Sequence, residues 1–222
     1  MRIHRRELGN DHSATLSSIN NLGVVLNDQG RSVEAEPLYR EALEARRRIL
    51  GNEHLDTLAS TTNMAGFLRA QGNMVEAEFL CREALEASRR ILGNEHPETL
   101  HAIFTMVGFL QNQGKMVNAE PLCREALETS RRNLEKDNPI TLKFVGNLTA
   151  ILLEQGKFGD AEPLGKEALE AHRRILGNEH PATLMSIYNM ADFLKDQGRT
   201  DEAEPLYREA LEVSRSVQGN EH

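Results

Sequence analysis

The sequence predicts an all-α solenoid built from five stacked helix-turn-helix repeats. The pentapeptide LGNEH and its near copies recur every 42 residues, beginning at Leu8, Leu50, Leu92, Leu134, Leu176 and Gln218. A fixed period of about 20–50 residues indicates a solenoid, whose units bury their apolar faces only by stacking on their neighbours. The chain has no Trp, and only 5% of its residues are aromatic, which is typical of a helical protein rich in Leu, Ala and Glu.

The period divides residues 1–222 into a single array without a second domain. The predicted repeats span residues 8–49, 50–91, 92–133, 134–175 and 176–217. Residues 2–7 align with residues 44–49, and the chain ends at His222 where a sixth repeat would begin. We therefore expect partial repeats at both ends and an array cut from a longer one. Uncapped end faces of this kind favour self-association.

The first helix of each repeat follows the LGNEH segment. In the third repeat Pro97 is suited to the first helical position, so the preceding His96 is predicted to cap the helix, as Asn138 is in the fourth. Apolar residues then recur at the i, i+3, i+4 spacing of one helix face, at Leu100, Ile103, Met106, Val107 and Leu110. A glycine that permits a left-handed turn ends the helix in every repeat, at Gly30, Gly72, Gly114, Gly156 and Gly198.

The second helix of the first repeat is predicted over residues 32–49. Ala35, Tyr39 and Ala42 share one face, and their alternation of small and large side chains lets neighbouring helices approach closely. Glu36 and Arg40 on the opposite face form an i, i+4 pair typical of a solvated surface.

Charge and composition exclude several classes of partner. The 26 Lys and Arg against 34 Asp and Glu give a net charge of −8, the wrong sign for holding a nucleic acid backbone. No apolar run approaches the length of about 20 residues that spans a bilayer, so we expect no membrane partner and a cytoplasmic location. The two cysteines, Cys81 and Cys123, lie one period apart and are predicted to be reduced core residues.

The sequence predicts no enzyme, no cofactor and no metal site. Its recurrent histidines, His12, His54, His96 and His180, are separated by whole repeats and cannot share one ion. The H-E-x-x-H, C-x-x-C and G-x-S-x-G motifs do not occur in the chain.

The pattern of turn glycines, with alanines at positions 35 and 42 and an aromatic or small residue at position 39, resembles the tetratricopeptide repeat in all five units. The 42-residue period, the EAEPLYREALE segment at Glu34 and the LGNEHPET linker at Leu92 resemble the repeats of kinesin light chains in particular. The resemblance implies a right-handed superhelix. It also implies that the first helices line a concave groove for an extended peptide segment of a partner protein.

The resemblance points to candidate groove residues on the first helices. One polar ladder consists of Asn21, Asn63, Asn147 and Asn189, with Thr105 in the third repeat. Side-chain amides can hold a peptide backbone, and the alternative is that they tie neighbouring helices together. Neighbouring positions add Asn20, Phe104, Tyr188, Arg69, Gln111 and Lys195. For Phe104 and Tyr188, packing between first helices is the equally weighted alternative.

The fourth repeat is predicted to be the weakest, because Gly146, Gly159 and Gly165 lie within its helices. As a function the sequence favours a non-enzymatic adaptor that binds an extended peptide segment. The alternative is a structural spacer, or a sensor array of a larger signalling protein, without a dedicated peptide site.

Overall fold

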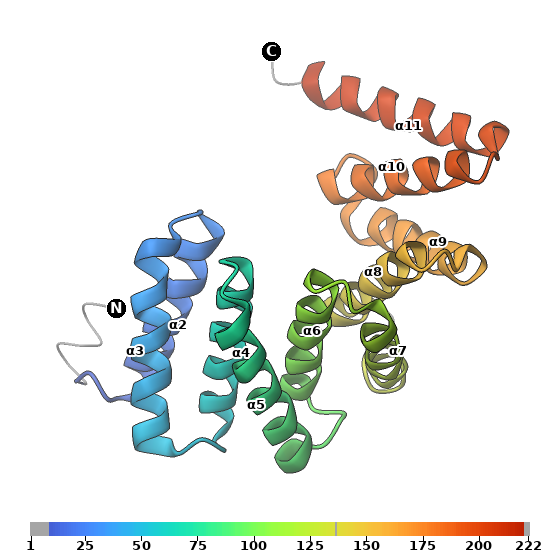
Figure 1. The fold of residues 1–222 in the computed structure, drawn as a ribbon. Coiled ribbons are helices and arrows are strands. Elements are labelled where there is room, and N and C mark those ends of the chain that lie inside the picture. Colours follow the sequence, from blue (N-terminus) through green and yellow to red (C-terminus); the bar gives the residue numbers. More distant parts are fainter. Residues whose placement is uncertain (1–8, 136, 220–222) are drawn as a thin grey trace. The chain divides into compact units, whose positions relative to one another are not determined.

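The computed structural model describes residues 9–135 and 137–219, and these residues form five consecutive helix pairs (Figure 1). The first helices of the repeats are α2 (Ser13–Asp28), α4 (Leu55–Ala70), α6 (Pro97–Asn112), α8 (Pro139–Glu154) and α10 (Pro181–Asp196). The second helices are α3 (Ser32–Leu50), α5 (Met74–Leu92), α7 (Met116–Asn133), α9 (Phe158–Leu176) and α11 (Thr200–Gly219). The predicted all-α solenoid is confirmed. The partial repeat expected before residue 8, and the end of the chain after residue 219, lie outside the described residues.

The chain divides into two compact units, Met1–Ser130 and Arg131–His222. We call them the N-terminal and C-terminal units. In the N-terminal unit α2 packs on α4 and α4 packs on α6, so the first helices stack directly. In the C-terminal unit each helix from α8 to α11 packs on the next one along the chain.

Histidine caps the first helix of four repeats, as predicted. The Nδ1 atom of His12, His54, His96 and His180 accepts a hydrogen bond from the backbone N–H two residues on, at 3.1–3.2 Å. In the fourth repeat the Oδ1 of Asn138 accepts the same bond from the N–H of Ile140 at 3.0 Å. These bonds satisfy backbone donors that a helix start otherwise leaves unpaired, and they give the repeated histidine a structural role.

The buried face of each second helix is built around a small side chain. The alanines equivalent to Ala35 are 0–2% exposed, at Ala35, Ala77, Ala119, Ala161 and Ala203. In the first repeat, Tyr39 of α3 packs over Gly23 of α2, where an added Cβ would lie 3.4 Å from the ring. A small residue on the first helix thus accommodates a large one on the second. Cys81 and Cys123 follow at the position of Tyr39, and both are buried and free.

Ion pairs join the second helices of neighbouring repeats. An arginine near the end of one helix contacts a glutamate on the next at 2.5–2.8 Å, in the pairs Arg47–Glu83, Arg89–Glu125, Arg131–Glu167 and Arg173–Glu209. Partly exposed pairs of this kind contribute about 0–1 kcal/mol each. All four pairs join second helices to one another and involve no residue of the first helices.

Candidate functional site

The asparagine ladder is used differently in different repeats. In the N-terminal unit, the side-chain nitrogen of Asn63 donates a hydrogen bond to Oδ1 of the buried Asn20 at 3.4 Å, which ties α4 to α2. Asn21 is exposed, whereas Thr105 is buried and donates its hydroxyl to the carbonyl of His101. The helix-tying role therefore describes Asn20 and Asn63 in this structure.

Other candidate residues of the N-terminal unit lie where α4 and α6 pack against each other. A Cβ added to Gly66 of α4 would lie 3.8 Å from the Thr105 methyl group of α6, and one added to Gly108 would lie 3.2 Å from the Arg69 guanidinium. Arg69 also donates to Oδ1 of Asn112 of α6 at 3.4 Å. Phe104 and Gln111 are half-buried on α6. Gly108 therefore gives the Arg69 side chain room against α6, whereas a methyl group at Gly66 would make only an ordinary contact.

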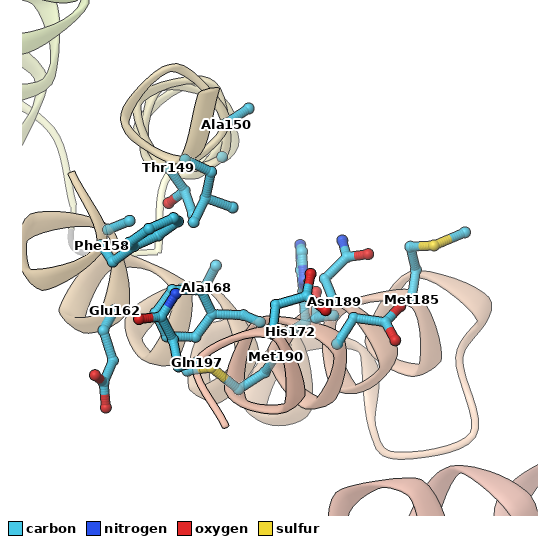
Figure 2. Close-up of a pocket in the computed structure, with 18 of the residues that line it drawn as sticks. Thr149, Ala150, Phe158, Glu162, Ala168, His172, Met185, Asn189, Met190 and Gln197 are labelled. Atoms are coloured by element: carbon cyan, nitrogen blue, oxygen red, sulfur yellow. The ribbon is translucent and has the colours of Figure 1, made fainter. Parts of the chain in front are cut away.

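A pocket of about 610 Å³ opens among α8, α9 and α10 of the C-terminal unit (Figure 2). Thr149 of α8 and Asn189 of α10 extend toward the space between these two helices, and Phe158 of α9 lies to one side. The volume is within the range of about 300–1,000 Å³ typical of ligand sites. The pocket is therefore the candidate functional site of the described chain.

Position 165 contributes no side chain to the lining of this space. Gly165 stands where the other repeats have Tyr39, Cys81, Cys123 and Tyr207. A Cβ at Gly165 would meet Met190 at 3.7 Å and Thr149 at 3.9 Å, which are ordinary van der Waals distances. Gly146, also on the lining, has nothing within 4 Å of an added Cβ.

Larger residues also stand at the positions of two glycines of α4 and α6. The positions of Gly66 and Gly108 are occupied by Ala150 of α8 and Asp192 of α10. Both residues line the pocket. The direct stacking of first helices seen at α4 and α6 is thus replaced at α8 and α10 by an open hollow.

The walls of the pocket are mainly apolar. They include Leu142, Leu153, Phe158, Met185, Met190 and Phe193. The Phe158 and Phe193 rings lie 6.2 Å apart between centroids, so they pack as an aromatic pair. Phe158 is 41% exposed and Met185 61% exposed, although most side chains of their type are buried in proteins. This surface can bind an apolar group.

Polar side chains surround the apolar surface. Asn189 is exposed and contributes an amide, which can donate and accept hydrogen bonds. His172 Nδ1 is hydrogen-bonded to the Ser186 hydroxyl at 2.7 Å, and the Thr149 hydroxyl donates to the Val145 carbonyl. Asn189 is therefore the lining group suited to meet a peptide backbone.

Every charged side chain that lines the pocket is a carboxylate, from Glu162, Asp192 and Asp196. Hydrogen bonds from Arg199 and Lys166, at 2.7 and 2.8 Å, lower the pKa of Glu162 to about 2. A hydrogen bond from the Tyr207 hydroxyl, followed by one from Lys195, lowers the pKa of Asp192. These two carboxylates are ionised at neutral pH.

The structure brings one member of the predicted site, Asn189, into the pocket. Tyr188 is 38% exposed on α10, with its ring 6.5 Å from that of Tyr207, and Lys195 pairs with Asp192 at 3.3 Å. Asn147 is half-buried on α8. The sequence analysis interpreted Gly165 only as a source of instability. The larger residues at this position in the other repeats were the signal that could have predicted a cavity.

Two further findings bear on the chemistry of the described residues. Between residues 9 and 135 and between 137 and 219, no three His, Cys, Asp or Glu side chains gather where they could hold a metal ion. None of the helices in these ranges is both long and apolar enough to cross a membrane.

Comparisons with known proteins identify the repeat. One sequence model of the tetratricopeptide repeat matches residues 15–56 and 57–98, and another matches residues 102–174 and 145–216. No curated protein sequence matches the chain.

Solved structures share the fold at low sequence identity. A putative kinesin light chain from Podosopora anserina with nearly identical TPR-like repeats is 23% identical, with 93% of this chain and 98% of that chain covered, at a TM-score of 0.77. BtubC (BKLC) from P. vanneervenii is 19% identical, with coverages of 98% and 86% and a TM-score of 0.82. A Rap protein complexed with Competence and Sporulation Factor is 14% identical, with coverages of 91% and 54% and a TM-score of 0.72.

Proposed function

The chain belongs to the tetratricopeptide repeat family, and on that premise we propose that it is a non-enzymatic scaffold that binds an extended segment of a partner protein along its first helices. The pocket among α8, α9 and α10 carries this proposal, because it is an apolar hollow of about 610 Å³ lined by two first helices and the second helix between them in the chain. Apolar surface left in contact with water lowers stability, and such sites commonly serve binding. A cytoplasmic location is part of the proposal, since both cysteines are free.

The proposed binding mode uses Asn147 and Asn189 as the polar contacts. Both lie at the same position of their repeats, on α8 and α10, and Asn189 lines the pocket. Each amide can bond both a carbonyl and an N–H of an extended peptide without requiring a particular side chain. The similarly folded Rap protein, which is complexed with Competence and Sporulation Factor, supports the use of such an array for binding.

A second candidate function, a structural spacer or sensor array, is favoured by a different observation. The Asn63–Asn20 hydrogen bond and the arginine–glutamate pairs between second helices connect one repeat to the next. In this role these contacts would set the stiffness of the array, and the pocket would have no ligand.

A selection of random 12-residue displayed peptides on the intact chain tests the proposal. The most enriched peptide is synthesised, and its Kd is measured by fluorescence anisotropy on the parent and on an Asn147→Ala/Asn189→Ala variant. We expect about tenfold weaker binding to the variant, which corresponds to the loss of one or two hydrogen bonds of about 0.5–1.5 kcal/mol each. Arg82→Ala on the exposed face of α5 is the matched control and should bind like the parent.

The two candidate functions predict different results. A scaffold enriches peptides and loses them in the asparagine variant while circular dichroism remains unchanged. A spacer enriches no peptide. In that case Asn63→Ala should still change the unfolding of the array, because it removes the hydrogen bond to Asn20.

A further inference from the structure

We infer that the pocket of the C-terminal unit receives a bulky apolar side chain of the partner segment, and that this segment carries a lysine or arginine within about three residues of it. The inference rests on the proposed function and specifies the partner. The repeat pattern alone does not require such a partner, because the lining includes departures from it, with Gly165 where other repeats have Tyr or Cys and Asp192 where others have Gly66 and Gly108.

The apolar part of the inference follows from what surrounds Gly165. Met190 and Thr149 lie at van der Waals distance from an added Cβ, and Phe158 and Phe193 form an aromatic wall beside them. In the first repeat the Tyr39 ring packs over Gly23, whereas the fourth repeat has Gly165 at the position of Tyr39 and Thr149 at the position of Gly23. The ring is therefore missing, the Thr149 side chain takes part of its place, and an apolar side chain of another protein can enter the remaining pocket. The unbranched Met190 and Met185 side chains can adapt to its shape.

The basic part follows from the charges of the lining. Glu162, Asp192 and Asp196 are the charged groups, so a carboxylate of the partner would be repelled and a cation attracted. Glu162 and Asp192 already have cations as neighbours. Asp196, in contrast, takes part in none of the ion pairs seen among the described residues, and it ends α10, where the helix dipole also favours a positive charge.

The spacing follows from helix geometry. Met185, Asn189, Asp192 and Asp196 recur at three and four residues along α10 and line the pocket from one face of that helix. Met190 and Asp196 are six residues apart, which is about 9 Å along the helix axis at about 1.5 Å per residue. An extended peptide covers this distance in about three residues. Asn189 adjoins Met190 on the same helix and would offer its amide to the peptide backbone beside the apolar anchor.

The test uses a defined peptide, acetyl-GSFGSRGS-amide, and two control peptides in which Arg becomes Glu or Phe becomes Ser. The intact chain is labelled with ¹³C at the methionine methyl groups, and the peptides are titrated while methyl spectra are recorded. Met185 and Met190 report on the pocket, and the buried Met64 and Met106 of the N-terminal unit are internal references. Each signal is assigned from its loss in a Met→Leu variant.

We expect a saturable shift of the Met185 and Met190 signals with the Phe and Arg peptide. The Glu control should bind at least about tenfold more weakly. Even in a dielectric like that of water one contact between charges changes the affinity several-fold, and the exchange of Arg for Glu replaces an attraction with a repulsion. Gly165→Tyr, which installs the residue found at positions 39 and 207, should abolish the shift. Gly165→Ala leaves most of the pocket open and should retain it. Circular dichroism equal to that of the parent, together with dispersed Met185 and Met190 signals before peptide is added, shows that the C-terminal unit of each variant is folded.

Equal binding of the Arg and Glu peptides, or binding that survives in Gly165→Tyr, would overturn the inference. Asp196→Asn provides an independent check with a side chain of nearly the same shape, and it should weaken the Arg peptide about fivefold. The Glu control should not be weakened, because this variant removes a charge that repels it. If peptides selected on the intact chain bind Gly165→Tyr as tightly as the parent, the scaffold function stands and the pocket inference fails. If neither selected nor designed peptides bind, both fail.

Discussion

The two glycines Gly165 and Gly156 give the sharpest test of the packing of the fourth repeat, because the same substitution should act on them with opposite sign. Gly165 lies within α9, where alanine is favoured over glycine by about 0.5–1 kcal/mol. Its new methyl group would contact Met190 and Thr149 at 3.7 and 3.9 Å without a clash, and burial of one carbon adds up to about 0.8 kcal/mol. The two contributions together predict that Gly165→Ala stabilises the chain by about 0.5–1.8 kcal/mol.

Gly156 ends α8 with a φ of 71°. An added Cβ would meet nothing within 4 Å, so only the backbone conformation matters there. A left-handed conformation costs a non-glycine residue about 1–2 kcal/mol. Gly156→Ala should therefore destabilise the chain by that amount.

Chemical unfolding followed by circular dichroism gives the free-energy changes, and thermal unfolding should shift by about 2–4 °C per kcal/mol for a chain of this size. Because repeat arrays can open locally, hydrogen exchange across residues 142–172 is the second measurement. We expect this segment of the parent to exchange faster than the first three repeats, and Gly165→Ala to slow it. Changes of the same sign at both glycines would refute the reasoning.

Three further predictions concern individual side chains. His54→Ala should destabilise the chain by about 1 kcal/mol in chemical unfolding, and His54→Asn should not, because Asn138 makes the same cap bond. Burial, opposed by a weaker hydrogen bond from Thr62, raises the pKa of Glu98, so its ionisation opposes folding. Glu98→Gln should raise the melting temperature at pH 7, and the gain should vanish as pH falls through the raised pKa; a gain that grew in acid would contradict this. Burial also raises the pKa of Cys81 to about 11 and of Cys123 to about 12, so iodoacetamide at pH 8 should label them rapidly only after unfolding in guanidinium.

The fold could be predicted because its determinants are local and repeated. Turn glycines, histidine caps and the small alanine position recur at 42-residue intervals, and each acts within one helix pair. The reduced, buried state of Cys81 and Cys123 followed from the same spacing. The Arg47–Glu83 contact was not predicted, because it joins residues in different repeats and depends on how neighbouring second helices are spaced.

The candidate site was predicted less well, because it arises from a departure from the repeat. Asn189 was identified from the ladder and lines the pocket, but Asn63 at the equivalent position is bonded to Asn20. Asn63 meets a polar partner on the preceding first helix, whereas Asn189 lies beside the hollow among α8, α9 and α10. A pattern that treats all repeats as equivalent does not contain this information.

Photo-crosslinking tests the central claim, that a partner segment binds along the first helices at the pocket. A peptide selected on the intact chain is synthesised with a photoreactive benzophenone in place of its apolar anchor, irradiated with the protein and mapped by mass spectrometry. The account predicts crosslinks to Met185, Met190 or other pocket-lining residues of α8, α9 and α10, and their loss in Gly165→Tyr. Crosslinks confined to the outer faces of α3, α5 or α11 would contradict it.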